Sequence, residues 1–290
     1  MMKWLLLAFL VALPAAAQEE PTNKEEQVVL MIIRPAKTAF KILEEARRRN
    51  PELERDGPRF TEKEAYLHVN EFLRYVYGLG DEIFPIVEEM LKKRKIQKDR
   101  DAYQFQDACA ILVGLEVVPV DRRLRVPRRL LRKRHLKDNI YFDVLTYSIG
   151  VLGAIGSDED VDLILPHVAH TEQNVRCWAI RAIGRIGRLS DIERLKAAVA
   201  AAPPLVMAPR YYDTAPYKDD FPEGLTAANA PDEDSRELVE GWAELVQEEL
   251  QKAIAGIRER AAAEAPLSSP KEKPSEPASR ETHESDNQSP

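Results

Sequence analysis

The side chains that could do chemistry in this sequence are mainly basic, and they are concentrated between residues 121 and 137. This segment contains Arg122, Arg123, Arg125, Arg128, Arg129, Arg132, Lys133, Arg134 and Lys137. The chain as a whole has a formal net charge of -7, so the segment differs in sign from its surroundings. Basic side chains at this density attract anions. The segment could therefore bind an acidic protein, an anionic lipid headgroup, a cell-wall polyanion or a nucleic acid.

A structural interpretation of the same segment is a solvated helix face. Val126, Leu130 and Leu131 would then pack inward, and the stems of the arginines would cover apolar surface. Nucleic acid is disfavoured as a ligand because the sequence has no recognised nucleic-acid motif. The candidate partner-binding residues of this basic insertion are Arg122, Arg123, Arg125, Arg128, Arg129 and Arg132.

Metal-binding and nucleophilic side chains are fewer. His167 and His170 are three residues apart and Glu172 is nearby, a spacing that can bring two imidazoles together. A catalytic zinc normally needs a third protein ligand and an open position, and these residues fall where a turn between helices is expected. We therefore predict an exposed histidine pair, no metal site and no cofactor. The sequence also lacks a G-x-S-x-G element, and no catalytic residue is assigned.

The elements that must position these side chains are indicated by a sequence unit that occurs twice between residues 142 and 199, with an offset of 31 residues. Matching positions include Val144 and Val175, Tyr147 and Trp178, Ile149 and Ile180, Leu152 and Ile183, Gly153 and Gly184, Gly156 and Gly187, Val161 and Ile192, and Ile164 and Leu195. The apolar positions recur at steps of three and four, as in amphipathic helices. Gly184 and Gly187 are expected where the first helix ends, at positions suited to positive φ or to close helix approach. The period fits two short helices and two turns, which is typical of a stacked solenoid.

The second copy resembles the HEAT repeats in their short bacterial form. The resemblance rests on Asn174-Val175-Arg176, followed by Ala179, Ala182, Ile183, Gly184, Ile186 and Gly187. It implies a right-handed superhelix of stacked helix pairs, and most proteins of this family bind other macromolecules. Some short HEAT-like proteins are chromophore lyases, which leaves an enzymatic alternative at the level of the fold. The earlier copy has Asp143-Val144-Leu145 without the arginine, so a continuous Asp/Arg ladder between repeats is not expected.

The two cysteines are predicted to be free. Cys109 and Cys177 each lie on an expected helix among apolar neighbours, in repeats separated by an intervening one. Packed helices lie about 8 to 10 Å apart, whereas a disulfide tolerates a Cα separation of only about 7 Å. We expect both to be small buried core residues.

Residues 1–17 have the pattern of a secretory signal peptide. Lys3 precedes an apolar run over residues 4–13, and three alanines follow at 15–17. This pattern predicts cleavage before Gln18. The apolar run is shorter than the roughly 20 residues that span a bilayer. We therefore predict an exported protein, periplasmic or extracellular, without a transmembrane segment after cleavage.

The rest of the chain divides by composition into 18–60, an N-terminal capping helix region; 61–202, the HEAT-like solenoid with the basic insertion 121–137; 203–233, a loop rich in proline and tyrosine; 234–264, an amphipathic helix; and 265–290, a tail. Pro35 is expected to kink or restart the capping helix. Thr61 and Glu64 have the spacing of a capping box. The tail has almost no apolar residue, so we predict that it is disordered.

Two tyrosines of the loop, Tyr211 and Tyr212, are further candidates for a partner contact, because tyrosine is favoured in interfaces. They could also simply hold the loop on the last repeat. The sequence therefore predicts an all-α, HEAT-like solenoid with a C-terminal helix and a disordered tail. Its predicted function is to bind a macromolecular partner, with a protein as the favoured class, on its concave face or basic insertion. The alternative is a cell-envelope enzyme, with lyase-like activity, built on the same scaffold.

Overall fold

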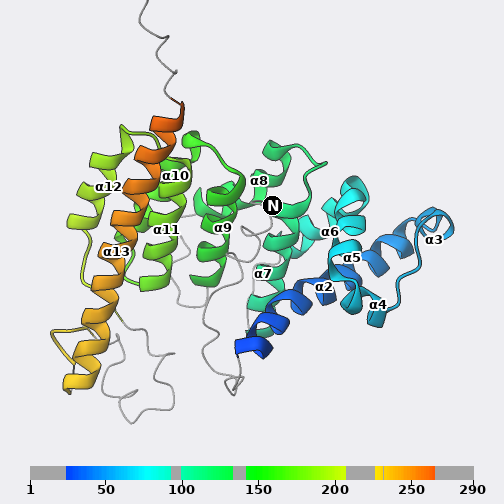
Figure 1. Cartoon of the computed structure of the whole chain (residues 1–290), viewed down its shortest axis with the longest axis horizontal. Helices are drawn as coiled ribbons and strands as arrows, with labels where there is room; N and C mark the ends of the chain where they lie inside the picture. The colour runs from blue at the N-terminus through cyan, green and yellow to red at the C-terminus, as the bar shows by residue number, and fades with distance from the viewer. Residues whose placement is uncertain (1–23, 93–98, 133–141, 207–225, 231, 265–290) are drawn as a thin grey trace, which may run out of the picture.

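The computed structural model describes residues 24–92, 99–132, 142–206, 226–230 and 232–264 (Figure 1). All regular secondary structure in these ranges is helical, which confirms the all-α class. The predicted signal peptide 1–17, Tyr211 and Tyr212, Lys133 to Lys137 and the tail 265–290 lie outside the described residues. No helix in the described ranges is both long enough and apolar enough to cross a membrane.

Residues 24–92 form five helices. They are α2 (Lys24–Arg49), α3 (Glu52–Asp56), α4 (Glu62–Leu67), α5 (Val69–Gly78) and α6 (Gly80–Lys92). Helix α2 continues through Pro35 and does not restart there. The predicted capping box is confirmed, because Thr61 and Glu64 each accept a hydrogen bond from the other's backbone N–H. Helix α2 packs against α4, α5, α6 and α7 and so joins this part to the rest of the molecule.

The remaining helices are α7 (Asp99–Gly114), α8 (Val120–Arg132), α9 (Phe142–Ile155), η2 (Asp158–Asp160), α10 (Val161–Ile164), η3 (Leu165–Ala169), α11 (Gln173–Ile186), α12 (Asp191–Ala200) and α13 (Glu233–Glu264). Helices α7, α9, α11 and α13 pack side by side in that order (Figure 1). Helix α8 packs against α9, η3 against α11, and α12 against α13. Each shorter element thus supports the next long helix in the row.

The sequence repeat corresponds to structure most closely in the long helices. Both ends of α11 are displaced from those of α9 by the repeat offset of 31 residues. The second half of the unit differs between the copies, because α12 is one α-helix whereas α10 gives way to the 3-10 helix η3. Pro166 lies in η3 at the position that corresponds to Ala197 of α12, and its missing N–H cannot donate the hydrogen bond that an α-helix makes there.

Equivalent glycines set the spacing of the long helices. A Cβ atom built on Gly153 would lie 2.7 Å from the Cβ of Ala182, and one built on Gly184 would lie 2.7 Å from the Cβ of Ala253. Helix α13 therefore packs on α11 through the same kind of close contact that α11 makes with α9. Gly184 lies inside α11, not at its end, and Gly187 has a φ of -72°. Close helix approach, not positive φ, is therefore the reason for glycine at 184.

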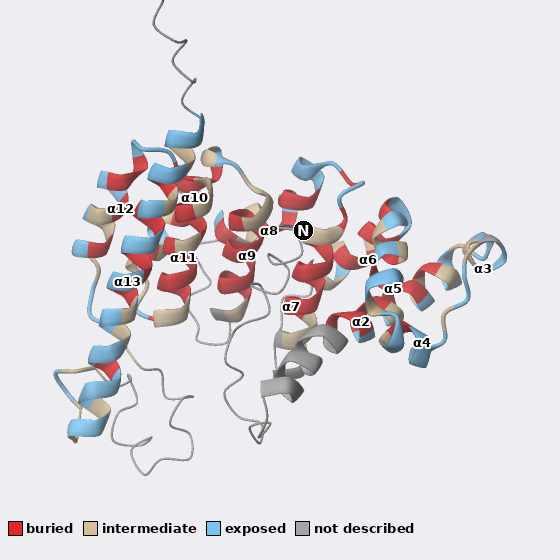
Figure 2. Ribbon diagram, in the orientation of Figure 1, coloured by how far each residue is buried: buried red, intermediate tan, exposed pale blue. Residues whose placement is uncertain are grey.

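The core runs through the row of long helices. Ile149, Ile180, Ile183 and Leu195 are completely buried. Figure 2 shows buried residues concentrated on α7, α9 and α11, and exposed residues along much of α13. Cys109 and Cys177 are buried free thiols, as predicted.

Candidate functional site

The basic segment predicted to bind a partner forms helix α8, and most of its arginines contact neighbouring helices. The Nη1 atom of Arg122 lies 2.6 Å from Oδ1 of Asp81, and Arg125 forms an ion pair with Glu88. Both carboxylates belong to α6. These two arginines therefore join α8 to α6, although their side chains remain partly exposed.

Arg128 makes the most buried of these ion pairs. Its Nε and Nη2 atoms donate to the two carboxylate oxygens of Asp160, over 2.7 and 3.0 Å. Asp160 is 1% exposed and also accepts a hydrogen bond from the backbone N–H of Ser157. Paired hydrogen bonds of this kind fix both distance and orientation. Arg128 thus ties α8 to the turn that follows α9.

Arg123 is also a structural residue. It is 5% exposed, and its Nη1 atom donates a 2.8 Å hydrogen bond to the carbonyl oxygen of Val113 at the end of α7. The guanidinium of Arg123 therefore faces a carbonyl at a helix end and not solvent, and a partner contact of this residue stays a prediction. Among the predicted arginines, Arg129 and Arg132 are exposed and contact no carboxylate of the described residues.

The histidine pair is not exposed as predicted. His167 and His170 are both half-buried in and after η3, and burial lowers the pKa of each, that of His170 to about 4. The Nδ1 atom of His170 accepts a hydrogen bond of 3.0 Å from the backbone N–H of Glu172. No three potential metal ligands converge within the described part of the chain. These histidines instead shape the turn before α11.

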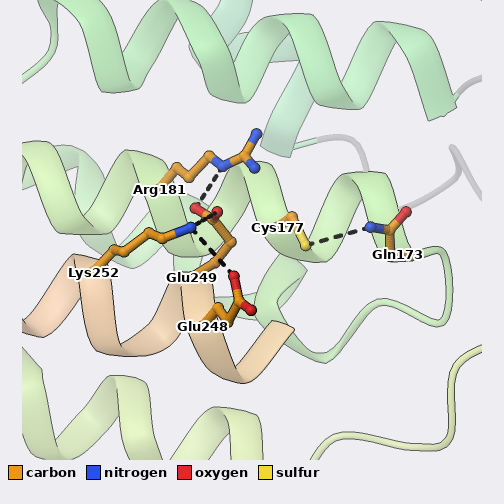
Figure 3. Close-up of polar contacts among 6 residues, drawn as sticks. All are labelled: Gln173, Cys177, Arg181, Glu248, Glu249 and Lys252. Atoms are coloured by element: carbon orange, nitrogen blue, oxygen red, sulfur yellow. Dashed lines mark hydrogen bonds and ion pairs between the residues drawn. The ribbon is translucent and has the colours of Figure 1, made fainter. Parts of the chain in front are cut away.

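A different polar site lies between α11 and α13 (Figure 3). Gln173, Cys177 and Arg181 follow one face of α11 at four-residue steps, and Arg181 points toward α13. The Nε atom of Arg181 lies 2.6 Å from Oε2 of Glu249, and Nζ of Lys252 lies 3.2 Å from the other oxygen of that carboxylate. One carboxylate of α13 therefore bridges two cations from two helices.

Arg260 makes a second connection between these helices. Its Nη1 atom donates to the carbonyl of Gly184 over 2.6 Å, and Nη2 donates to the carbonyl of Gly187 over 2.9 Å. The last carbonyls of a helix have no partner within that helix and attract cations. Arg260 thus caps the carboxyl end of α11 and holds α13 beside it.

A hollow of about 560 Å³ lies over this contact. We call it the α11–α13 groove, and it is lined by Arg181, Gly184, Arg185, Glu249, Lys252, Ala253, Gly256 and Arg260. Four of these side chains are cationic and one is anionic. The two glycines and the alanine leave room above the contact between the helices.

The electrostatics of the groove reflect this imbalance. Burial lowers the pKa of Arg185, and the neighbouring charge of Arg181 lowers it further. Burial alone would raise the pKa of Glu249, but Arg181 and Lys252 lower it overall. Burial raises the pKa of Cys177 to about 11, so its thiol is protonated at neutral pH. The nearby thiol of Cys177 is therefore not activated.

Sequence reasoning missed the groove, although the repeat contained a signal for it. Arg181 and Arg185 occupy the positions that correspond to Gly150 and Ala154 in the earlier copy. The second copy therefore departs from the first, because two small residues are replaced by arginines on adjacent turns of one helix. Such a departure is expected where a scaffold position has acquired a separate role.

Comparison of the chain with family models, with curated proteins and with solved structures finds no match. The site is therefore interpreted from its own geometry.

Proposed function

We propose that the protein is an exported HEAT-like solenoid that binds a protein partner. The observation that carries the proposal is the repeated contact between long helices, in which Gly153 meets Ala182 and Gly184 meets Ala253. Stacked helices of this kind form an extended surface that can bind a partner without an enclosed pocket. The C-terminal helix α13 acts as the last member of the row in this proposal.

Helix α8 is less suited to binding than its arginine content suggests. Arg122, Arg125 and Arg128 of α8 are engaged with carboxylates of the same chain. In the α11–α13 groove, Arg181 and Lys252 share Glu249, and Arg260 donates to two carbonyls of α11 and its carboxyl end. The proposal therefore rests on the extended row of long helices and not on a cluster of charges.

Affinity capture with the full chain from an envelope extract of the source organism tests this function. We expect one protein to be retained, in an amount close to that of the immobilised chain. A variant carrying Arg129→Glu and Arg132→Glu should retain the same amount of that protein. That variant reverses charge on α8 without breaking the Arg128–Asp160 pair. The absence of any protein above a blank resin would contradict the proposed function. If the variant does not retain the partner protein, α8 is the binding surface.

Export is proposed from the signal-peptide pattern of residues 1–17. Cell fractionation followed by N-terminal sequencing tests it. We expect the protein outside the cytoplasm with Gln18 as its first residue. A cytoplasmic protein that still begins at Met1 would contradict export and leave the binding proposal to be tested separately.

A further inference from the structure

We infer that the turn before α11 is an acid-sensitive latch, in which protonation of His170 releases the segment 203–206 that follows α12. The contacts between residues 170–176 and residues 203–206 are called the histidine latch below. They fix the path of the chain as it leaves α12. The inference goes beyond the proposed binding function and does not depend on it.

Two hydrogen-bonded connections hold the segment after α12 against this turn. Arg176 donates from Nε to the carbonyl of His170 over 2.9 Å and from Nη2 to the carbonyl of Pro203 over 2.7 Å. The backbone N–H of Val206 donates to the carbonyl of Thr171 over 3.0 Å. Arg176 is 6% exposed, so its guanidinium is buried within the latch.

His170 lies between these two connections and makes a hydrogen bond that depends on its charge. Its Nδ1 atom accepts a hydrogen bond of 3.0 Å from the backbone N–H of Glu172. A neutral imidazole accepts through one nitrogen, whereas both nitrogens of a protonated imidazole carry hydrogen and donate. Protonation of His170 therefore sets two N–H groups against each other and breaks this bond.

The surroundings of His170 oppose a positive charge on its ring. Burial, the neighbouring His167 and the guanidinium of Arg176 lower the pKa of His170 from its ordinary value of 6.5 to about 4. Burial also lowers the pKa of His167. Glu172 is the acidic residue of the turn and is 2% exposed. The charged side chains of the other helices packed against η3 are paired with one another: Asp162 of α10, and Asp191, Glu193, Arg194 and Lys196 of α12.

The sign of the pH dependence follows from the lowered pKa. When the latch opens and the turn is solvated, the pKa of His170 returns to its ordinary value of 6.5, so the open form takes up a proton first. The closed latch is therefore fully stable above pH 6.5 and loses stability as the pH falls toward 4. Between pH 7 and pH 5, His170 alone should shift the equilibrium toward the open form by about twentyfold.

The sequence repeat shows that the titratable group is specific to the second copy. The offset of 31 residues places Asn139 at the position of His170, and Leu145 at the position of Arg176. An asparagine side chain can accept the same kind of hydrogen bond from a backbone N–H two residues further on, but it does not titrate. Asparagine is therefore a suitable substitute for testing the role of His170.

Hydrogen exchange of the full chain, resolved to single amides by NMR, tests the inference. The amide of Val206 reports opening of the latch, and the amide of Ile149 in the core of α9 reports global unfolding. From pH 7 to pH 5 we expect the protection factor of Val206 to fall by about twentyfold and that of Ile149 to fall much less. A fall below about threefold at Val206 would overturn the inference, as would equal falls at both amides.

His170→Asn separates protonation of this histidine from other effects of acid. The variant keeps an acceptor for the N–H of Glu172, so Val206 should be as protected at pH 7 as in the wild-type chain. Its loss of protection at pH 5 should be at least about tenfold smaller. The matched control is His68→Asn, which removes an exposed histidine between α4 and α5 and should keep the wild-type pH dependence. The inference is wrong if both variants lose protection equally steeply.

Arg176→Lys tests the geometry of the latch at neutral pH. A lysine keeps the positive charge but lacks the planar fork that reaches both carbonyls. The protection factor of Val206 at pH 7 should fall by about tenfold, the effect of losing a charged hydrogen bond, while Ile149 stays protected. Unchanged protection of Val206 in this variant would also overturn the inference.

Discussion

Helix α8 and the α11–α13 groove are both rich in arginine, but they use it differently. On α8, Arg122, Arg125 and Arg128 each meet a carboxylate from a neighbouring element. In the groove, Arg181 meets Glu249, whereas Arg260 donates to the carbonyls of Gly184 and Gly187. The comparison shows that the density of arginine along a sequence does not identify a binding surface, because these side chains can be engaged with carboxylates or carbonyls of the same chain.

The α8 pairs continue as a series of ion pairs across the shorter elements. Arg188 pairs with Asp158, and Arg194 lies within ion-pair distance of both Asp162 and Asp191. These ion pairs join η2 and α10 to the turn before α12 and to α12. Most of these pairs are partly exposed, so each contributes little alone. Together they set the register of neighbouring helices.

The largest expected effect on stability comes from a substitution in the core of the row of long helices. Ile183→Ala deletes a completely buried side chain of α11. We expect a loss of roughly 2 to 5 kcal/mol in the free energy of unfolding, because a core cavity is left behind. Denaturant unfolding measures this loss, and a change near zero would mean that α11 does not pack as described.

The next largest effect should separate structural arginines from exposed ones. Arg128→Ala leaves the buried carboxylate of Asp160 without its bidentate partner. We expect a loss of about 2 kcal/mol in the free energy of unfolding, below the value for a fully buried pair because Arg128 is partly exposed. A double-mutant cycle with Asp160→Ala checks the pairing. Additive effects in that cycle would contradict an ion pair between these two residues.

A smaller effect is expected in the groove. Glu249→Gln removes the charge that partly balances Arg181 and Lys252, and should cost about 1 kcal/mol at neutral pH. The folded-state pKa of Glu249 lies below its ordinary value of 4.5. Its contribution to stability is therefore present above pH 4.5 and is lost as the pH falls through the folded-state pKa. Unfolding curves of both proteins should converge at acid pH, and a difference that grows on acidification would oppose this assignment.

The smallest effect should come from the exposed arginines of α8. Arg129→Ala should change the free energy of unfolding by less than about 0.5 kcal/mol, as is usual for surface positions. The same denaturant series used for Arg128→Ala provides the measurement. A cost as large as that of Arg128→Ala would mean that Arg129 is also part of the packing between elements.

Much of the fold was accessible from local patterns. The 31-residue repeat relates α9 to α11, and the capping box at Thr61 follows from two residues three apart. The 3-10 helix η3 does not follow from the repeat, because the two copies differ there: Pro166 in the first corresponds to Ala197 in the second.

The candidate site was less accessible because its contacts are remote in the sequence. Arg128 and Asp160 are 32 residues apart, Arg181 and Glu249 are 68 apart, and Arg260 and Gly184 are 76 apart. No spacing rule within one helix predicts such pairs. The sequence pattern placed arginines on a helix, but the packing of α13 against α11 determines which of them share a groove.

Denaturant unfolding of Gly153→Leu and Gly184→Leu tests most directly the claim that α13 packs on α11 in the same way that α11 packs on α9. A Cβ atom at either position would lie 2.7 Å from a Cβ atom of the neighbouring helix. Our account predicts that each variant loses about 1 to 3 kcal/mol in the free energy of unfolding, because the added side chain forces the two helices apart. A Gly184→Leu variant as stable as the wild-type chain would contradict the close packing of α13 on α11.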